Sequence, residues 1–252
     1  VNGSHKETIN IFGEEIDLFS DINWHEDVIN KKVFPKIFCK DINIRTDELG
    51  NAKFVWELNR LQFLPSLLFK YLSTRNNKYF EQFMDIIISW KKDNPYLIGV
   101  NWHSNIEINL RLITWYWCWN ILEIDKELKS NSKFKKFIDE TWIPLIYMHC
   151  KYSYENPSKF SSANNHLISE YAGLFVATSL FNFKETPKWN LYAKKGLELE
   201  IDNQHSINGI NQEEASKYIS FVTDFLLLSW LVGENTNNKF SENYKLKLKA
   251  IF

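Results

Sequence analysis

The 252-residue sequence predicts an all-α domain, on three observations. Apolar residues recur at helical spacing in long segments from residue 53 onward, and alternating strand patterns are nearly absent after residue 50. Short polar connections separate these segments, which is typical of helices that run antiparallel to their neighbours. Hydrophobic residues make up 44% of the chain, enough for one sizeable core.

Residues 1–50 predict an irregular lead-in. Ile9–Gly13 has the composition of a short strand, and polar turns follow it. We therefore place a boundary near residue 50, with the helical domain over residues 51–252.

The first three predicted helices lie before residue 123. One begins at Lys53, and its apolar stripe extends to Leu68. The next covers Tyr79–Lys91 and ends before Pro95, because the residue preceding a proline is disfavoured in a helix. The third covers about 104–122 and is apolar on nearly every face, which indicates burial on several sides.

Four more helices are predicted in the second half. The first has a kink at Pro144, because proline lacks the N–H group that a helix interior needs. The four segments are Lys133–Tyr152, Asn165–Phe181, Trp189–Asn203 and Glu213–Val232.

Composition excludes several classes of function. Thirty basic and thirty-one acidic side chains leave a formal charge of −1, so nucleic acid is not an expected partner. The three cysteines lack metal-ligand spacing, and neither an HExxH motif nor a phosphate-binding glycine loop occurs, so we expect no metal and no cofactor. No apolar run predicts a transmembrane segment, and no signal segment is visible in a chain that opens on Val1. The 16% aromatic residues either fill a helical core or line a groove for sugar rings.

The stretch Ser161–Tyr171 places two amides and an imidazole at the entry to a predicted helix. Asn164 or Asn165 is a good N-cap, and His166 follows directly. A helix N-terminus exposes unpaired N–H groups and a partial positive charge, which suits an anion such as a sugar carboxylate. The same polar cluster is equally compatible with a helix cap that has no chemical role.

Four stretches in chain order carry a family resemblance. They are Lys53–Arg60; Gly99–Trp102 leading to Glu107 and Arg111; Asn164-Asn165-His166 with Glu170; and Gly209 followed by Glu213 and Tyr218. Together they resemble the heparinase II/III family of polysaccharide lyases, which includes alginate and oligo-alginate lyases. The likeness extends from about residue 9 to residue 232.

This resemblance implies an incomplete α/α toroid of paired helices, usually followed by a β-sandwich domain that packs on it. The sequence ends at Phe252 before any strand-rich region, so we expect the chain to be the helical domain of a longer protein. The resemblance also implies an acidic polysaccharide or oligosaccharide as partner and a periplasmic or secreted location.

The family reaction is β-elimination on a uronic-acid-containing polysaccharide. By the resemblance, Asn165 would neutralise the sugar carboxylate, and His166 would be the base or share that task. Tyr218 would be the acid, and Glu170, one helical turn after His166, would orient the imidazole. In the alternative readings, His166 is a capping or core histidine and Tyr218 packs in its helix.

Five further side chains are candidates for substrate binding: Asn59, Arg60, Trp102, Arg111 and Glu213. Both arginines lie in strongly apolar helices, where a charge must be paired or must face a groove. Each has a glutamate about one turn back, Glu57 or Glu107, so pairing within the helix is the alternative to binding a sulfate or carboxylate. For Trp102 the alternative is core packing.

Two other classes of function stay open. A carbohydrate-binding or polysaccharide-assembly module could keep the toroid without the chemistry. A glycoside hydrolase would require two carboxylates about 5–9.5 Å apart across a groove, and Glu170 and Glu213 are the pair to measure.

Overall fold

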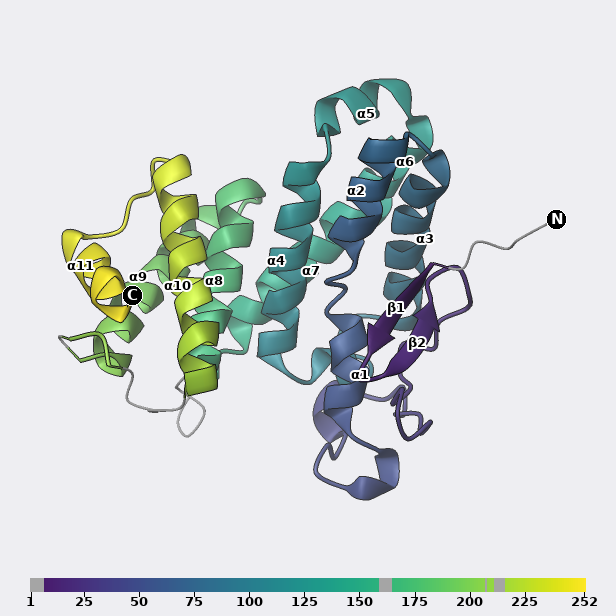
Figure 1. The fold of residues 1–252 in the computed structure, drawn as a ribbon, viewed down its shortest axis with the longest axis horizontal. Helices are drawn as coiled ribbons and strands as arrows, with labels where there is room; N and C mark the ends of the chain where they lie inside the picture. The colour runs from purple at the N-terminus through teal and green to yellow at the C-terminus, as the bar shows by residue number, and fades with distance from the viewer. Residues whose placement is uncertain (1–6, 159–164, 207, 211–215) are drawn as a thin grey trace. The chain divides into compact units, whose positions relative to one another are not determined.

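The computed structural model describes residues 7–158, 165–206, 208–210 and 216–252, without the side chains at positions 47, 130 and 216–219 (Figure 1). The predicted all-α class is confirmed. No described helix has both the length and the hydropathy needed to cross a bilayer. The elements are β1 (Thr8–Ile11), β2 (Glu14–Asp17), η1 (Cys39–Asp41), η2 (Asp47–Leu49), α1 (Ala52–Asn59), α2 (Leu64–Thr74), α3 (Asn77–Asp93), η3 (Val100–Trp102), α4 (Asn105–Ile121), α5 (Ile124–Ser130), α6 (Ser132–Phe137), η4 (Ile138–Trp142), α7 (Ile143–Glu155), α8 (Asn165–Leu180), α9 (Thr186–Gln204), α10 (Ser216–Asn235) and α11 (Glu242–Ile251).

The chain divides into two compact units, which are described separately. Unit 1 is Val1–Glu107 with Trp117–Met148, and unit 2 is Ile108–Tyr116 with His149–Phe252. Helices α4 and α7 therefore contribute residues to both units.

The lead-in of unit 1 contains a β-hairpin of which the sequence predicted one strand. Strands β1 and β2 are antiparallel, with Ile11 opposite Glu14. The two turn residues, Phe12 and Gly13, have φ values of 52° and 97°, as a two-residue hairpin loop requires. Strand β2 was not predicted, because its glutamates have a low strand propensity.

The single helix expected from Lys53 onward is two helices, α1 and α2. They are separated at Leu61, which has a φ of 58°, and Pro65 follows in the first turn of α2. Leu61 is fully buried, so packing holds it in a backbone conformation that a leucine rarely adopts. The apolar periodicity of the sequence does not reveal this break, because tertiary packing causes it.

The kink expected at Pro144 is realised as a π-helical turn, Ile138–Trp142, ahead of α7. Proline has no N–H to donate to the carbonyl of Glu140, one turn earlier. The ammonium of Lys91 donates to that carbonyl at 2.6 Å. The lysine thus satisfies an acceptor that the proline leaves without its helical donor.

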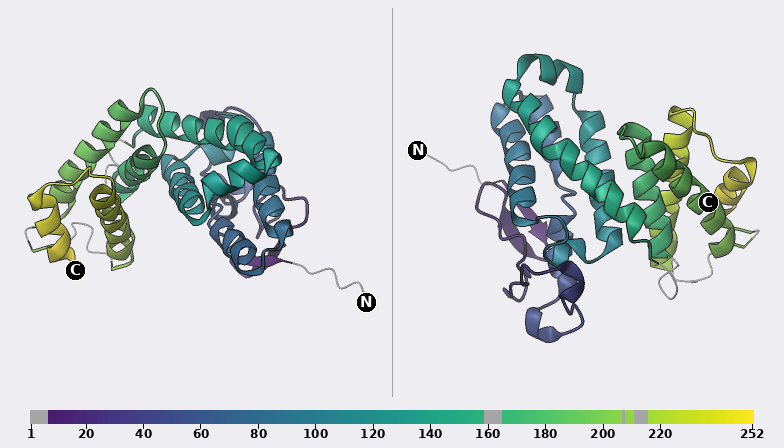
Figure 2. Two further views of the ribbon diagram at one scale, coloured as in Figure 1. Left: turned by 90° about the horizontal axis from the view of Figure 1, so that it is seen from above. Right: turned by 180° about the vertical axis from the view of Figure 1, so that it is seen from behind.

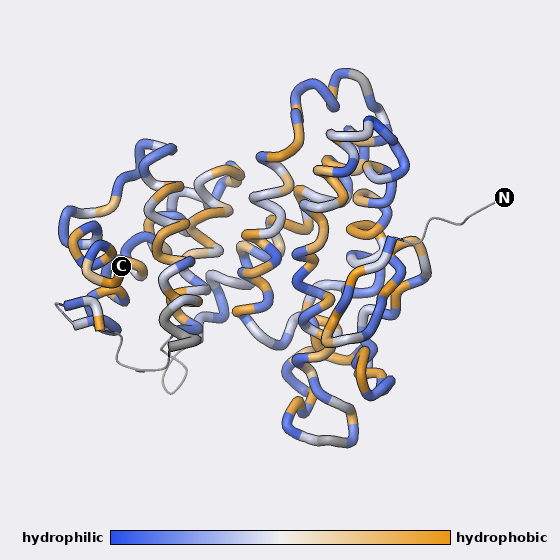
Figure 3. Tube along the Cα trace, in the orientation of Figure 1, coloured by the Kyte–Doolittle hydropathy of each residue, from blue (hydrophilic) through white to orange (hydrophobic). Residues whose placement is uncertain are grey.

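Aromatic rings fill the core of unit 1 between α3, α6 and the π-helical turn. Phe80 lies 5.0 Å from Phe134, and Phe83 lies 5.2 Å from Trp142, between ring centroids. Figure 3 shows hydrophobic residues interspersed with hydrophilic ones along α3. Much of the high aromatic content therefore serves packing.

Unit 2 is organised around α8, which is buried at nearly every position from Asn165 to Thr178. Helices α8 and α9 form an antiparallel pair, visible in both orientations of Figure 2. Helix α10 also packs on α8. A Cβ atom at Gly173 would lie 2.5 Å from the Cβ atom of Asn109, so only glycine allows α8 to approach α4 so closely.

Candidate functional site

The first turn of α8 carries the amide and imidazole that the sequence singled out. Asn165 is its first residue and is 6% exposed, and its Oδ1 atom has no hydrogen-bond partner among the described residues. Buried polar atoms nearly always have a partner. The amide oxygen is therefore buried without a hydrogen bond from the described part of the fold.

His166 follows on the same turn and is half-buried. Its backbone carbonyl accepts a hydrogen bond from Ser169 Oγ at 2.7 Å. Its imidazole forms no hydrogen bond to a described residue. His166 is thus the second residue of α8, next to a helix N-terminus, and no described residue bonds its ring nitrogens.

Glu170 connects this turn to the segment after α7. Its buried carboxylate accepts hydrogen bonds from the N–H of Ser158 at 2.8 Å and from the Oγ of Ser158 at 2.5 Å. These bonds give Glu170 an anchoring task within unit 2. Its predicted role in orienting His166 stays a prediction.

The helix directions bring the start of α10 to the same end of unit 2 as the start of α8. Thr236 and Asn238, which follow α10, line one cavity with Ser179 from the last turn of α8. The two helices therefore run in the same direction, so Asn165 and Tyr218 both lie in the first turn at the opposite end. The structure describes the backbone of Tyr218 but not its side chain, and Asn164 and Glu213 are not among the described residues.

Three tyrosines that the sequence did not single out cluster next to Glu170. Tyr171 donates a hydrogen bond to Tyr192, with their ring centroids 5.3 Å apart, and Tyr154 lies 4.9 Å from Tyr192. Burial, followed by that hydrogen bond, raises the pKa of the Tyr171 phenol. The three residues come from α7, α8 and α9, so no sequence spacing relates them.

Arg111 is fully buried in α4 and donates a hydrogen bond from Nε to Nε2 of His149 at 3.0 Å. The His149 ring meets the edge of Trp115 at 4.6 Å. An accepting Nε2 requires the tautomer with its proton on Nδ1. This pairing was not predicted, because α7 supplies a histidine far from Arg111 in sequence.

Arg60 in unit 1 is held by two carboxylates. Its Nε and Nη2 donate to Glu107 at 2.8 and 3.0 Å, and its Nη1 donates to Glu57 at 2.5 Å. Burial opposes the charge, but the hydrogen bonds and charges of the two glutamates raise the pKa of the guanidinium. The predicted pair with Glu57 is present, and Glu107 adds a bidentate contact.

Asn59 and Trp102 both lie in the core of unit 1. The Asn59 amide donates to the carbonyl of Trp24 at 3.0 Å and accepts from Trp90 Nε1 at 2.8 Å. Trp102 is fully buried and donates to the carbonyl of Asn94 at 3.2 Å. These contacts are structural, and substrate contact by Asn59, Arg60 and Trp102 stays a prediction that we do not carry into the proposed site.

Comparison with known proteins decides the family. The family model for the heparinase II/III N-terminus matches residues 9–252. The chain belongs to the heparinase II/III family. Within this family, a heparin-sulfate lyase of Pedobacter heparinus is 22% identical over 217 residues, which cover 82% of this chain and 31% of the lyase.

Solved structures of heparinase II/III lyases share the fold. A heparan sulfate lyase mutant from Pedobacter heparinus aligns with a TM-score of 0.68 at 17% identity, covering 94% of this chain and 39% of that one. A heparinase III gene product aligns with a TM-score of 0.67 at 19% identity, covering 93% and 38%. The predicted helical toroid class is confirmed by this likeness. The chain spans less than two fifths of the length of these relatives.

The described residues of this heparinase II/III chain contain no cluster of three or more His, Cys, Asp or Glu side chains that could hold a metal ion. The described polar groups in this part of unit 2 are instead the amide of Asn165 and the imidazole of His166 in the first turn of α8, and the phenols of Tyr154, Tyr171 and Tyr192. Such groups can donate hydrogen bonds to an anion and move protons.

Proposed function

We propose that this chain forms the helical part of an enzyme that cleaves a uronic-acid-containing polysaccharide by β-elimination. Membership of the heparinase II/III family supports the class of reaction. The observation that carries the proposal is Asn165, an amide buried at a helix N-terminus whose Oδ1 has no partner among the described residues. Next to it lies the imidazole of His166, which no described residue hydrogen-bonds.

The reaction needs the sugar carboxylate to be neutralised before its α-proton can leave. The side-chain N–H of Asn165 donates to a carboxylate oxygen, and the partial positive charge at the start of α8 acts in the same direction. The Oδ1 atom of Asn165 accepts a hydrogen bond from a sugar hydroxyl. Because the amide is buried, this hydrogen bond is stronger than it would be in water. Charge that develops on the carboxylate is thereby stabilised.

Proton transfer then falls to His166 and Tyr218. His166 takes the α-proton, the bond to the 4-oxygen breaks, and the electron pair left on carbon forms the new double bond in the ring. Tyr218 gives its proton to the departing oxygen. Tyr171 is unsuited as the base, because its raised pKa keeps the phenol protonated near neutral pH.

The substitution Asn165→Asp tests this assignment in the full-length protein. It preserves the shape of the side chain but places a negative charge against the substrate carboxylate. An acidic residue in the first turn of a helix favours folding and offsets part of the cost of burying the charge, so the protein should remain folded. We expect kcat on uronic polymers, followed by ultraviolet absorbance of the unsaturated product, to fall by about 10²–10³-fold.

Asn182→Asp is the matched control, since Asn182 is exposed in the turn between α8 and α9. It should leave kcat unchanged. Full activity of the Asn165→Asp protein would refute the role of the amide. Oligosaccharide binding by the wild type without any unsaturated product would refute the lyase proposal and indicate a carbohydrate-binding module.

A further inference from the structure

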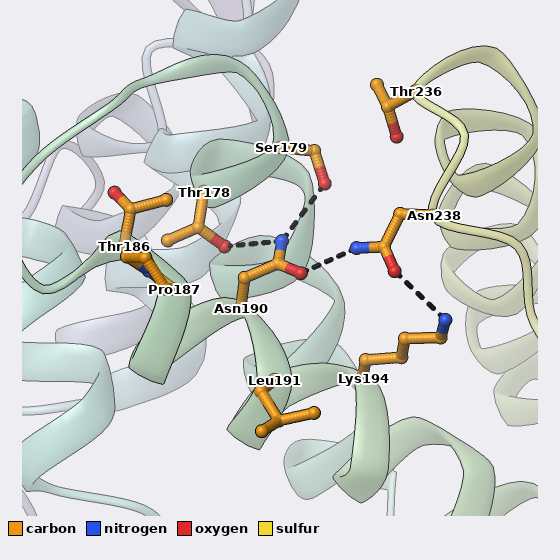
Figure 4. Close-up of a pocket in the computed structure, with 9 residues that line it drawn as sticks. All are labelled: Thr178, Ser179, Thr186, Pro187, Asn190, Leu191, Lys194, Thr236 and Asn238. Atoms are coloured by element: carbon orange, nitrogen blue, oxygen red, sulfur yellow. Dashed lines mark hydrogen bonds between the residues drawn. The ribbon is translucent and has the colours of Figure 1, made fainter.

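A cavity of about 360 Å³ lies at the end of α8 that is remote from Asn165. The last turn of α8, the first half of α9 and the segment after α10 form its walls, and all belong to unit 2 (Figure 4). Thr178 lies thirteen positions after Asn165 on α8, so the cavity is roughly 20 Å from the candidate site along the helix. We name it the α8–α9 pocket.

A chain of side-chain hydrogen bonds crosses the α8–α9 pocket. Lys194 Nζ donates to Asn238 Oδ1 at 2.9 Å, and Asn238 Nδ2 donates to Asn190 Oδ1 at 2.6 Å. Asn190 Nδ2 donates in turn to Thr178 Oγ1 at 3.1 Å and Ser179 Oγ at 3.2 Å, as Figure 4 shows. The chain fixes the orientation of both amides before any ligand arrives.

The same side chains keep hydrogen-bonding capacity for a ligand. Asn238 Nδ2 has a second N–H, and Lys194 uses two of its three, on Asn238 and on the carbonyl of Lys239 at 2.6 Å. Thr236 Oγ1 donates to the carbonyl of Val232 at 2.8 Å and keeps its lone pairs. The pocket therefore offers both donors and acceptors to a ligand rich in hydroxyl groups.

Lys194 contributes a positive charge that the described residues do not neutralise. Its ammonium is half-buried and contacts neutral oxygens and the ring of Phe240, with the centroid at 5.6 Å. No described carboxylate forms an ion pair with it, in contrast to Lys245 and Lys247 on α11. Glu198, one turn on along α9, is instead bonded to Ser241. A half-buried charge of this kind favours an anionic partner.

We propose that the α8–α9 pocket binds a sugar ring that carries one carboxylate or sulfate group. The amides and hydroxyls would bond the ring hydroxyls, and Lys194 would bond the anion. Leu191, which is 53% exposed, and Pro187 offer an apolar rim for the C–H face of the ring. The volume is near the lower end of small-molecule sites, roughly 300–1,000 Å³, so one or two rings fit.

Titration of the full-length protein, labelled with ¹⁵N at asparagine, tests the proposal without relying on turnover. The side-chain amide signals of Asn190 and Asn238 report on this pocket, so the result does not depend on whether the lyase proposal holds. The probes are an acidic disaccharide, a neutral disaccharide of the same linkage, and inorganic sulfate. We expect both signals to shift with the acidic disaccharide, with an affinity about tenfold above that of the neutral one.

Lys194→Met removes the charge and keeps the length of the side chain. It should weaken binding of the acidic disaccharide about tenfold. The matched control is Lys195→Met, an exposed lysine that does not line the pocket, and it should leave the affinity unchanged. Asn238→Asp, which supplies an internal partner to Lys194, should weaken binding as well and is independent of any loss of packing in the first variant.

Four outcomes would overturn the proposal. They are silent amide signals with every probe, equal affinity for the acidic and neutral disaccharides, unchanged affinity in the folded Lys194→Met protein, and sulfate binding as tightly as the acidic disaccharide. The last of these would mark the pocket as a simple anion site.

Discussion

Gly209 makes the most demanding backbone contact among the described glycines. Its φ is 77°, in the left-handed region, and a Cβ atom there would overlap the carbonyl group of Ala250 in α11 and lie 2.5 Å from the N atom of Ile251. Gly209 ends the turn that begins at Ser206, whose carbonyl accepts its N–H at 3.0 Å. Gly209 is one of the residues that carry the family resemblance, and its close approach to α11 is a physical reason for a glycine at this position.

Gly209→Ala should therefore destabilise the protein through two separate effects. The left-handed backbone costs an alanine about 1–2 kcal/mol. The overlap with backbone atoms adds a cost of overpacking, about 1–3 kcal/mol. The cost of overpacking has an upper limit, because the overlap is also relieved if α11 detaches. Detachment would lose the burial of Tyr244 and Leu248, which is worth about 1.5–3 kcal/mol each.

Gly13→Ala is the matched control for this prediction. Gly13 also has a positive φ, 97°, but an added Cβ would have no atom within 4 Å. Urea unfolding should show that Gly209→Ala loses about 1–3 kcal/mol more than Gly13→Ala, and hydrogen exchange should accelerate over 242–251. Equal losses in the two variants would refute the claim that the approach of α11 excludes a side chain at Gly209.

Two further predictions concern buried charge in unit 1. Burial lowers the pKa of His25 below its usual 6.5, although a hydrogen bond to the Asp93 carbonyl acts against it. The unfolded chain then binds the proton more readily, so the unfolding free energy should be fully present above pH 6.5 and decline as the pH falls toward the lowered folded pKa. Thermal melts should show a flatter decline in His25→Gln, and an unchanged slope would contradict this assignment. Arg60→Gln should lower the free energy of unfolding by roughly 2–4 kcal/mol, because it leaves the buried Glu107 carboxylate without its partner. Adding Glu107→Gln should restore part of this loss. Unchanged stability with a raised KM would instead indicate that Arg60 binds substrate.

Helix periodicity predicted the elements whose burial follows one face, and it missed those decided by tertiary contacts. Helix α11 is an example, because Tyr244–Lys249 alternates apolar and charged residues as a strand would. Ser241 caps it through Tyr244 N at 3.1 Å, and only the pair Tyr244 and Leu248, four residues apart, is buried. Leu246, which a strand would place on the same face as Tyr244 and Leu248, is 64% exposed. Burial of the two residues at helical spacing therefore decides the structure, although the sequence alternates like a strand.

In the candidate site, too, the sequence predicts what depends on neighbouring residues and misses what depends on contacts between distant residues. Asn165 and His166 could be proposed from the sequence because helix capping is a local pattern of adjacent residues. The tyrosine pair Tyr171 and Tyr192 was not found, because it depends on the antiparallel packing of α8 on α9. Gly196 allows this packing, since a Cβ there would lie 2.5 Å from the Tyr171 ring.

The stretches that carry the family likeness have different physical tasks. In the first two, polar side chains bond backbone carbonyls of unit 1. Trp56 Nε1 donates to the Val100 carbonyl at 3.0 Å, and Asn59 and Asn101 both donate to the carbonyl of Trp24 in the lead-in. Such bonds fix the fold, because leaving these buried groups without partners would cost about 1–3 kcal/mol each. Asn165 is the buried amide of the third stretch, and its Oδ1 has no hydrogen-bond partner among the described residues. A ligand group that donates a hydrogen bond to this oxygen, such as a sugar hydroxyl, would offset that cost, and this supports the start of α8 as the proposed site.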